Sequence, residues 1–381
     1  MQKVTLNVYK DLLKKLYENN ISGIVYGGYG IGKTAIEQDV AKTIAEEKGK
    51  EYVEWNDADE QKKIEVENDP SSYFVNAIVH LAQFDSVDLH GLPSLNGSSY
   101  TVWKPIRVIK LFSRKGISGI FFLDEYPQSR EDVQKASTQL IRDRQMGDVP
   151  LQNNVFVFAA GNREEDNSGA MPLLEHVKDR FVEMEVMFEK EYYLGDVNKG
   201  TGGFFEERLE PELYIFLQYD PSWLYKVDEA KKDKAVTPRG IMERANVMLK
   251  EYKDNPDMWY DAISISVGEG FASAFISWYN IRAKLNIDKI LRQPESVKDI
   301  TSPGALYSLV YVLYNRYKNN YGIFNKVIDV VSELNQTKEG AYVMTLLKKM
   351  KNLNPRGFKK IVKHKAWKDN LASVYAEFMD V

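Results

Sequence analysis

The sequence predicts an α/β fold, with a parallel β-sheet and flanking helices in the first half of the chain and helices alone in the second. Two observations lead to this prediction. Short apolar runs that end in polar residues recur through residues 1–195, as the buried strands of a parallel sheet do. From residue 205 onward the apolar residues recur instead at the spacing of a helix face.

The first predicted strand is followed by a glycine-rich loop. Residues 24–26 form a short apolar run, and residues 35–47 carry an isoleucine or valine at every fourth position, as an amphipathic helix does. Between them, residues 27–34 read GGYGIGKT, which matches the pattern G-x-x-x-x-G-K-T. A strand, this loop and a helix, in that order, form the arrangement that binds nucleotide phosphates.

The residue types in this loop suit a phosphate group. Its four glycines permit backbone torsions that are closed to other residues, so successive N–H groups can point at one anion. The following helix adds the positive end of its dipole. Lys33 would reach the outer phosphates, and Thr34 would place its hydroxyl on Mg²⁺. The alternative is a glycine-rich turn that matches the pattern by chance. The predicted phosphate-binding residues are Gly27, Gly28, Tyr29, Gly30, Ile31, Gly32, Lys33 and Thr34.

A second strand delivers two carboxylates. Residues 117–123 form an apolar run that ends in Asp124 and Glu125. An open α/β sheet binds its ligand at the carboxyl ends of its strands. We therefore expect Asp124 to hold Mg²⁺ through water and Glu125 to polarise the attacking water. The alternative is a strand that ends in an ordinary polar turn.

A third strand ends in an amide. Residues 154–160 are apolar after the first position and are followed by Gly161 and Asn162. On a strand beside the acidic one, Asn162 would contact the γ-phosphate or the lytic water. Asparagine after glycine is also common in turns, which is the alternative interpretation.

Two arginines are candidates for stabilising the transition state. Arg180 falls between a predicted short helix and a predicted strand over 181–187, where it could complete a neighbouring subunit's site as an arginine finger. Arg239 follows Thr237, a predicted N-cap, and Pro238. It therefore lies in a first helical turn, where the dipole disfavours a cation and an anionic partner such as phosphate is expected. The alternatives are a surface salt bridge for Arg180 and a solvated side chain for Arg239.

The composition is that of an ordinary globular protein. Hydrophobic residues make up 44% and charged residues 28% of the 381 residues, and a net charge of −4 gives no reason to expect nucleic acid or an anionic membrane as the main partner. The absence of cysteine excludes disulfides, thiolate catalysis and cysteine–zinc sites, and fits a cytoplasmic location. No apolar stretch reaches the roughly 20 residues of a membrane span, so no membrane partner is expected.

Together the motifs resemble those of AAA+ ATPases, most closely the MoxR-like branch. GGYGIGKT, FFLDE, FAAGN, LLEHVKDRF and TPRG occur in the order of that family, over roughly residues 5–280. The stretch FDSVDLHGLPSLNGSSYTVWKP resembles the one that precedes the helix-2 insertion of MoxR-like proteins. The resemblance implies ATP and Mg²⁺ as ligands. It assigns residues 27–34 as the phosphate loop, Asp124 and Glu125 as the acidic pair, Asn162 as the first sensor, Arg180 as the trans-acting finger and Arg239 as the second sensor.

The resemblance also implies an assembly. Members of the family form rings, usually hexamers, that remodel a protein client and are often coupled to a von Willebrand factor A-type partner. The expected function is therefore ATP hydrolysis in a ring to remodel or assemble a protein client. The expected organisation is an AAA+ core over residues 1–195, a helical lid over 205–280 and a helical extension over 281–381.

Two segments of the predicted core need separate comment, because one does not match the family and the other is its insertion. Residues 51–69 form an acidic stretch that does not match the family and are expected to be a surface excursion. The insertion after Asp88 would face the pore of the ring, where Tyr100 and Trp103 could grip a client chain. The alternative is that both aromatic side chains pack the insertion onto the core.

The chain's C-terminal region leaves a second function open. Nine basic and no acidic residues lie between residues 348 and 368. A solvated helix face accounts for them most simply, and an acidic partner or nucleic acid backbone is the alternative. A nucleic-acid translocase or loader on the same ATPase engine is thus the second hypothesis, which we do not favour. A non-hydrolytic switch is a third, disfavoured because Glu125 is intact.

Overall fold

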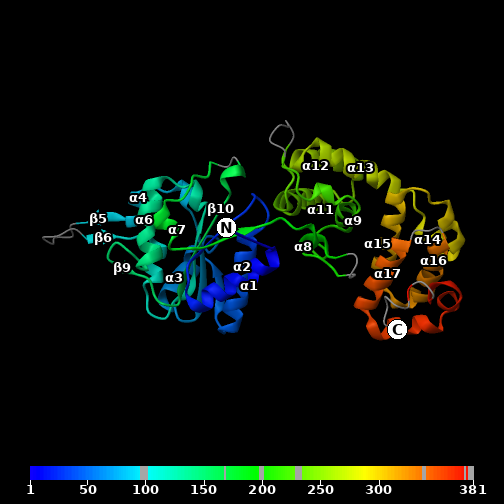
Figure 1. The fold of residues 1–381 in the computed structure, drawn as a ribbon, viewed down its shortest axis with the longest axis horizontal. Helices are drawn as coiled ribbons and strands as arrows, with labels where there is room; N and C mark the ends of the chain where they lie inside the picture. Colours follow the sequence, from blue (N-terminus) through cyan, green and yellow to red (C-terminus); the bar gives the residue numbers. More distant parts are fainter. Residues whose placement is uncertain are drawn as a thin grey trace. The chain divides into compact units, whose positions relative to one another are not determined.

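The computed structural model describes residues 1–94, 102–166, 169–196, 201–227, 234–336, 340–372 and 375. It divides into two compact units, Met1–Glu189 and Lys190–Val381 (Figure 1). The first unit is α/β and the second is helical, so the predicted fold class is confirmed.

The first unit is built on a seven-stranded sheet in which every neighbouring pair is parallel. The strand order is β1-β11-β2-β10-β7-β4-β3. The strands are β1 (Gln2–Val4), β2 (Gly23–Tyr26), β3 (Glu51–Glu54), β4 (Tyr73–His80), β7 (Ser118–Asp124), β10 (Val155–Gly161) and β11 (Val182–Val186).

Helices cover both faces of this sheet (Figure 1), so the central strands β2, β7 and β10 consist mostly of buried apolar residues. On one face, Phe156 and Phe158 of β10 pack against Tyr17 and Tyr9 of α1. On the other face, the alternate residues of β10 join a core that includes side chains of α5, α6 and α7. The helices of this unit are α1 (Leu6–Asn19), α2 (Lys33–Glu47), α3 (Glu60–Asn68), α4 (Ser86–His90), α5 (Arg107–Phe112), α6 (Glu131–Arg142) and α7 (Glu175–Lys178).

Residues 51–69 are not a surface excursion, so that expectation was wrong. They contribute β3 at the edge of the sheet and all of α3. Val53 of β3 pairs with Val75 of β4 and is 5% exposed. The strand reads EYVE, and a single apolar residue between polar ones gives too weak a signal to distinguish an edge strand from a loop.

The insertion after Asp88 forms a two-stranded antiparallel hairpin of β5 (Leu92–Ser94) and β6 (Val102–Lys104). Tyr100 lies outside the described residues. Trp103 is 39% exposed, and its ring centroid lies 6.4 Å from that of His90. A second small hairpin joins β8 (Gln145–Met146) and β9 (Val149–Pro150).

The second unit is a set of packed helices with an aromatic core. Phe216 of α9 contacts Phe271, Phe275 and Trp278 of α13. Helix α15 packs against α9, α13 and α17, so the segments expected as lid and extension form one compact unit. The helices are α8 (Lys190–Leu194), α9 (Pro211–Tyr219), α10 (Pro238–Gly240), α11 (Asn246–Glu251), α12 (Trp259–Val267), α13 (Glu269–Ala283), α14 (Ile287–Arg292), α15 (Pro303–Asn319), α16 (Phe324–Gln336), α17 (Gly340–Leu353) and α18 (Pro355–Phe358).

Within the described residues of both units, none of the helices combines the length and the apolar character that crossing a bilayer requires.

Candidate functional site

The topology of the sheet brings three of the predicted motifs together. Strand β10 lies between β2 and β7, and all three run in the same direction. Their carboxyl ends are therefore neighbours at one edge of the sheet. The glycine-rich loop follows β2, Asp124 ends β7 and is followed by Glu125, and Asn162 follows β10.

The glycines of the loop serve two different purposes. Gly30 and Gly32 adopt φ angles of 71° and 86°, which a side chain disfavours. Gly27 has no positive φ, but a Cβ there would lie 2.9 Å from the carbonyl oxygen of Val186. The torsional reason therefore holds for Gly30 and Gly32, whereas it was wrong for Gly27 and Gly28.

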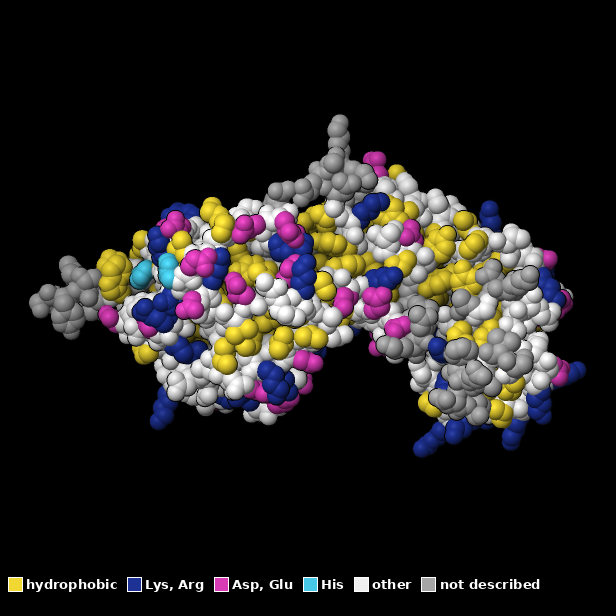
Figure 2. Space-filling view, viewed as in Figure 1, with side chains coloured by type: hydrophobic (Ala, Val, Ile, Leu, Met, Phe, Trp, Pro, Cys, Tyr) yellow, Lys and Arg dark blue, Asp and Glu magenta, His cyan; other side chains and the backbone are white. Residues whose placement is uncertain are grey.

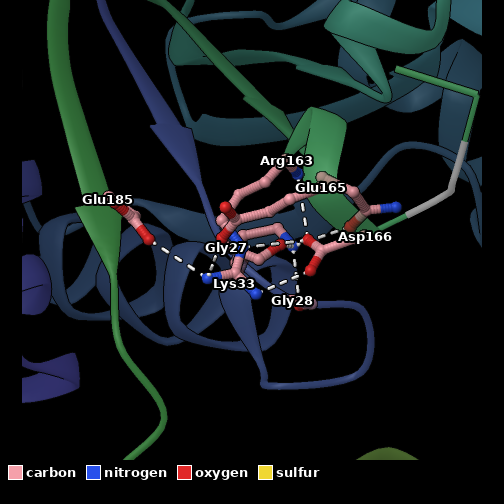
Figure 3. Close-up of polar contacts among 8 residues, drawn as sticks. Gly27, Gly28, Lys33, Arg163, Glu165, Asp166 and Glu185 are labelled. Carbon is pink, nitrogen blue, oxygen red and sulfur yellow. Dashed lines mark hydrogen bonds and ion pairs between the residues drawn. The ribbon is translucent and has the colours of Figure 1, made fainter. Parts of the chain in front are cut away.

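Lys33 is the first residue of α2 and lies at the centre of the site (Figure 3). Its ammonium group donates to the carbonyl oxygens of Gly27 at 2.6 Å and Gly28 at 3.0 Å, and to Oδ1 of Asn162 at 3.0 Å. The residue is 8% exposed. Phosphate oxygens are acceptors of the same kind, so a buried cation surrounded by oxygen atoms suits an incoming phosphate.

The next residue connects the loop to the acidic strand. Oγ1 of Thr34 donates to Oδ2 of Asp124 at 3.3 Å. A hydroxyl and a carboxylate side by side are hard oxygen ligands of the kind that Mg²⁺ prefers, together with water and phosphate oxygens. The donor set therefore fits the ion that the sequence implies.

Glu125 has a strained backbone. Its φ and ψ are 56° and 33°, the left-handed region that residues other than glycine rarely adopt, and its N–H donates to Oδ1 of Asp124 at 2.9 Å. Its carboxylate forms no hydrogen bond with the residues that the structure describes. Strain of this type is common where a side chain must point at a ligand.

A close approach sets the spacing between the acidic turn and Asn162. A Cβ on Gly161 would lie 2.1 Å from Cδ of Pro127, which follows the Glu125 turn. Only glycine lets the end of β10 come this near to that turn. Gly161 thus allows Asn162 and Glu125 to approach the same region of the site.

Arg163, which holds the segment after β10, was not predicted from the sequence. Its guanidinium binds both carboxylate oxygens of Asp166 at 2.6 and 3.1 Å, and also Glu165 at 2.9 Å and Glu185 of β11 at 3.2 Å (Figure 3). The hydrogen bond to Asp166 is the main reason that the pKa of Arg163 is raised. The signal in the sequence was an arginine directly before three consecutive acidic residues.

His80 was also missed. It ends β4 and pairs in register with Asp124, and its Nδ1 lies 3.8 Å from Oδ2 of that residue. The histidine is a neighbour of the predicted magnesium ligand because β4 and β7 are adjacent strands, which sequence spacing does not reveal.

Arg180 does not lie at this edge of the sheet. It precedes β11, whose first residue Val182 pairs with Gly23 at the start of β2. The loop begins after the other end of β2, roughly 13 Å from Gly23 at about 3.3 Å per residue. The Arg180 guanidinium donates to the carbonyl oxygen of His176 in α7.

Arg239 belongs to the second unit. Thr237 caps the helix as predicted, since its Oγ1 accepts the N–H of Gly240 at 3.1 Å, and Pro238 begins the helix. The Arg239 side chain is exposed. Its role toward phosphate stays a prediction.

Comparisons with known proteins add only distant similarity. No family model matches the chain, and no curated protein matches it. Similar solved structures include a point mutant of RuvB from Thermotoga maritima, at 15% identity and a TM-score of 0.32, covering 81% of this chain and 80% of that one. NtrX from Brucella abortus in complex with ADP has 11% identity and a TM-score of 0.36, covering 98% and 68%. The ORC2 protein of Aeropyrum pernix, in ADPNP and ADP complexes, has 14% identity and a TM-score of 0.33, covering 89% and 84%. At these values the similarity assigns neither a family nor an activity.

Proposed function

We propose that the chain is an AAA+ ATPase of the MoxR-like type, which hydrolyses ATP in a ring to remodel or assemble a protein client. One observation carries the ATPase part. The contacts from Lys33 to Asn162 and from Thr34 to Asp124 join the ends of three parallel strands around one group of donors and acceptors.

The residues of this site have distinct roles in hydrolysis. The N–H groups of residues 27–34 and the ammonium group of Lys33 bind the phosphates. Thr34 and Asp124 would hold Mg²⁺, which when bound offsets the charge of the phosphate oxygens. The Glu125 carboxylate orients and polarises the attacking water, and Asn162 fixes the γ-phosphate or that water.

Glu125→Gln tests the proposal. The variant should bind ATP as the parent does, because the phosphate-binding groups are untouched, and its turnover should fall about 100-fold or more, because general-base catalysis typically contributes about 10²–10⁴. ATP binding and phosphate release would be measured on the same samples. The matched control is Glu131→Gln, an exposed carboxylate on α6. Parent-like turnover of Glu125→Gln would remove Glu125 from the mechanism.

The assembly rests on the resemblance alone. A hexameric ring, a protein client and a von Willebrand factor A-type partner are what MoxR-like proteins imply. Trp103 on the β5–β6 hairpin is 39% exposed, which leaves part of its ring open to a client, and the same ring lies beside His90 of α4. A pull-down with Glu125→Gln in the presence of ATP, which should hold the ring on its client, would identify that client.

A nucleic-acid translocase or loader is the second candidate, and one observation favours it. Six cations between residues 356 and 368 are exposed and form no ion pair with the described residues, and Figure 2 shows basic side chains along this part of the second unit. They are Arg356, Lys359, Lys360, Lys363, Lys365 and Lys368. The longer basic stretch of residues 348–368 is not uniformly solvated, however, because Lys349 is 2% exposed and its Nζ lies 3.3 Å from Oε1 of Glu206.

A further inference from the structure

A buried polar cluster lies behind the phosphate loop and takes no part in the roles described above. Glu37 is on α2, one helical turn after Lys33, and is 0% exposed. It faces Asn76 of β4, which is also 0% exposed, and through it Glu54 of β3. An isolated buried carboxylate is costly, so a favourable interaction or a bound proton has to offset its burial.

The carboxyl groups of Glu37 and Glu54 accept different numbers of hydrogen bonds. Nδ2 of Asn76 donates to Oε2 of Glu37 at 3.1 Å and to Oε2 of Glu54 at 3.2 Å. The same oxygen of Glu54 also accepts from the hydroxyl of Tyr52 at 2.6 Å and from Nε2 of Gln38 at 3.1 Å. Glu54 therefore has three donors to stabilise a negative charge, whereas Glu37 has one.

Burial and neighbouring charges also affect the pKa values of Glu37 and Glu54 differently. Burial is the largest cause of the raised pKa of Glu37, and the charges of Glu54 and Asp124 raise it further, while the hydrogen bond from Asn76 opposes them. The pKa of Glu54 is also raised, mainly by burial, although hydrogen bonds from Tyr52, Asn76 and Gln38 all oppose this effect. Among the described residues, Tyr9 of α1 and Tyr52 of β3 are further titratable groups whose pKa the charge of Glu37 would raise. Two carboxyl groups that share one amide cannot both ionise cheaply.

We propose that Glu37 is a positioning residue of the phosphate site, a neutral carboxylic acid that links α2 through Asn76 to the ionised Glu54 at the edge of the sheet. This link holds the first turns of α2, and hence Lys33 and Thr34, against β3 and β4. The Tyr9 hydroxyl of α1 donates to the carbonyl oxygen of Lys33 at 3.3 Å and joins the start of α2 to α1. The positioning role rests on the proposed function, whereas the placement of the proton does not.

The proton on Glu37 should favour both the folded state and nucleotide binding, so both should weaken as pH rises. Because the folded pKa exceeds the unfolded one, the favourable contribution is complete below the unfolded pKa and is lost as pH rises toward the folded pKa. Ionisation would also place a negative charge near Asp124 and behind the bound phosphates, which it would repel. Both the stability and the nucleotide affinity of the parent should therefore fall with rising pH more than those of Glu37→Gln.

The test compares Glu37→Gln with Glu54→Gln. The free energy of unfolding would be measured by chemical denaturation from about pH 5 to about pH 9. The parent's unfolding equilibrium constant should rise relative to that of Glu37→Gln, by up to about tenfold per pH unit, because unfolding of the parent releases one proton. Glu54→Gln should be destabilised about tenfold or more throughout, because its amide oxygen accepts the three hydrogen bonds more weakly than a carboxylate does and its NH2 group would replace a buried oxygen that has no partner. An identical pH slope for parent and Glu37→Gln, or a milder effect of Glu54→Gln, would overturn the assignment. So would a Glu37→Gln chain that does not fold, because the substitution preserves shape and neutrality.

The positioning role is tested by the affinity for a fluorescent ADP derivative in the same buffers. Above the pH at which the unfolding curves of parent and Glu37→Gln become parallel, Glu37 is ionised in the folded protein, and the parent should lose severalfold more affinity than Glu37→Gln. Changes in the nucleotide's own charge cancel in this comparison. Equal losses above that pH would overturn the positioning role. If the parent binds no nucleotide at any pH, the proposed function fails, while the unfolding measurements still decide where the proton lies.

Discussion

At the residue scale, we expect nucleotide binding to depend most on Lys33. In the proposed site its ammonium group would exchange hydrogen bonds with three oxygen atoms for bonds to phosphate. Lys33→Ala should reduce ATP affinity about 10- to 150-fold, because a hydrogen bond to a charged group is worth about 1.5–3 kcal/mol. Isothermal titration with an ATP analogue would measure this loss. Lys42→Ala, which removes an exposed lysine from the same helix, is the control and should bind as the parent does.

Gly161 makes a different contribution, since it allows two segments of the site to approach each other. Gly161→Ala should destabilise the fold by about 1–3 kcal/mol, because the added Cβ overlaps the ring of Pro127. Urea unfolding would measure this cost. Adding Pro127→Ala to that variant should recover part of the loss, because the overlapping ring atoms are gone. If the double variant is no more stable than Gly161→Ala, the close approach is not the cause.

At the element scale, the strands that could be predicted are those buried on both faces. Strands β2, β7 and β10 were expected within a residue or two of their bounds, because burial on both faces requires a short, continuous apolar run, and the polar residue after each run marks its end. Edge strand β3 was missed because one of its faces is polar. The order of the strands in the sheet determines which side chains meet at the site, and the sequence does not reveal this order. Only the structure shows that β4 lies beside β7, which places His80 next to Asp124.

The same limit applies to side chains whose partners lie on other elements. Glu37 follows the glycine-rich loop in a helix that also carries other polar residues, and nothing in the sequence distinguishes it from an exposed glutamate. Its burial and its link to Asn76 depend on the packing of α2 against β4. The motif residues were predictable because their chemistry requires a fixed spacing along the chain. Supporting residues such as Glu37 need only be close in space to their partners, so they leave no pattern in the sequence.

The basic segment from residue 356 to residue 368 allows a prediction about an element as a whole. Reversing Lys359, Lys360 and Lys363 to Glu should leave ATPase activity unchanged, because no residue of the proposed site lies in this segment. Weak, salt-sensitive DNA binding should decrease in the same variant. Fluorescence anisotropy with duplex DNA at several salt concentrations would measure it. The control reverses Lys284, Lys289 and Lys326, which are exposed elsewhere in the second unit. A large loss of DNA-stimulated ATPase activity, confined to the first variant, would favour the translocase hypothesis.

At the scale of the whole molecule, Arg180 tests whether the protein acts as a single subunit or as a ring. Arg180 lies by the amino-terminal end of β11, whereas the phosphate loop follows the carboxyl end of β2. We propose that Arg180 is an arginine finger that acts on the phosphates of a neighbouring subunit. Arg180→Ala should therefore bind nucleotide as the parent does and lose most hydrolysis, and the parent's specific activity should rise with protein concentration as rings form.

Mixing two inactive variants tests this arrangement directly. Lys33→Ala lacks a working pocket but has Arg180, and Arg180→Ala lacks the finger but has the pocket. In mixed rings some interfaces pair an intact pocket with an intact finger, so ATP hydrolysis should return in part when the two are combined. Phosphate release would be measured across a series of mixing ratios, with co-assembly confirmed by light scattering and by retention of an untagged variant on a tagged one. A trans-acting finger predicts a maximum at intermediate ratios. If co-assembled mixtures stay inactive, or if Arg180→Ala alone hydrolyses at the parent rate, Arg180 does not act across a subunit boundary.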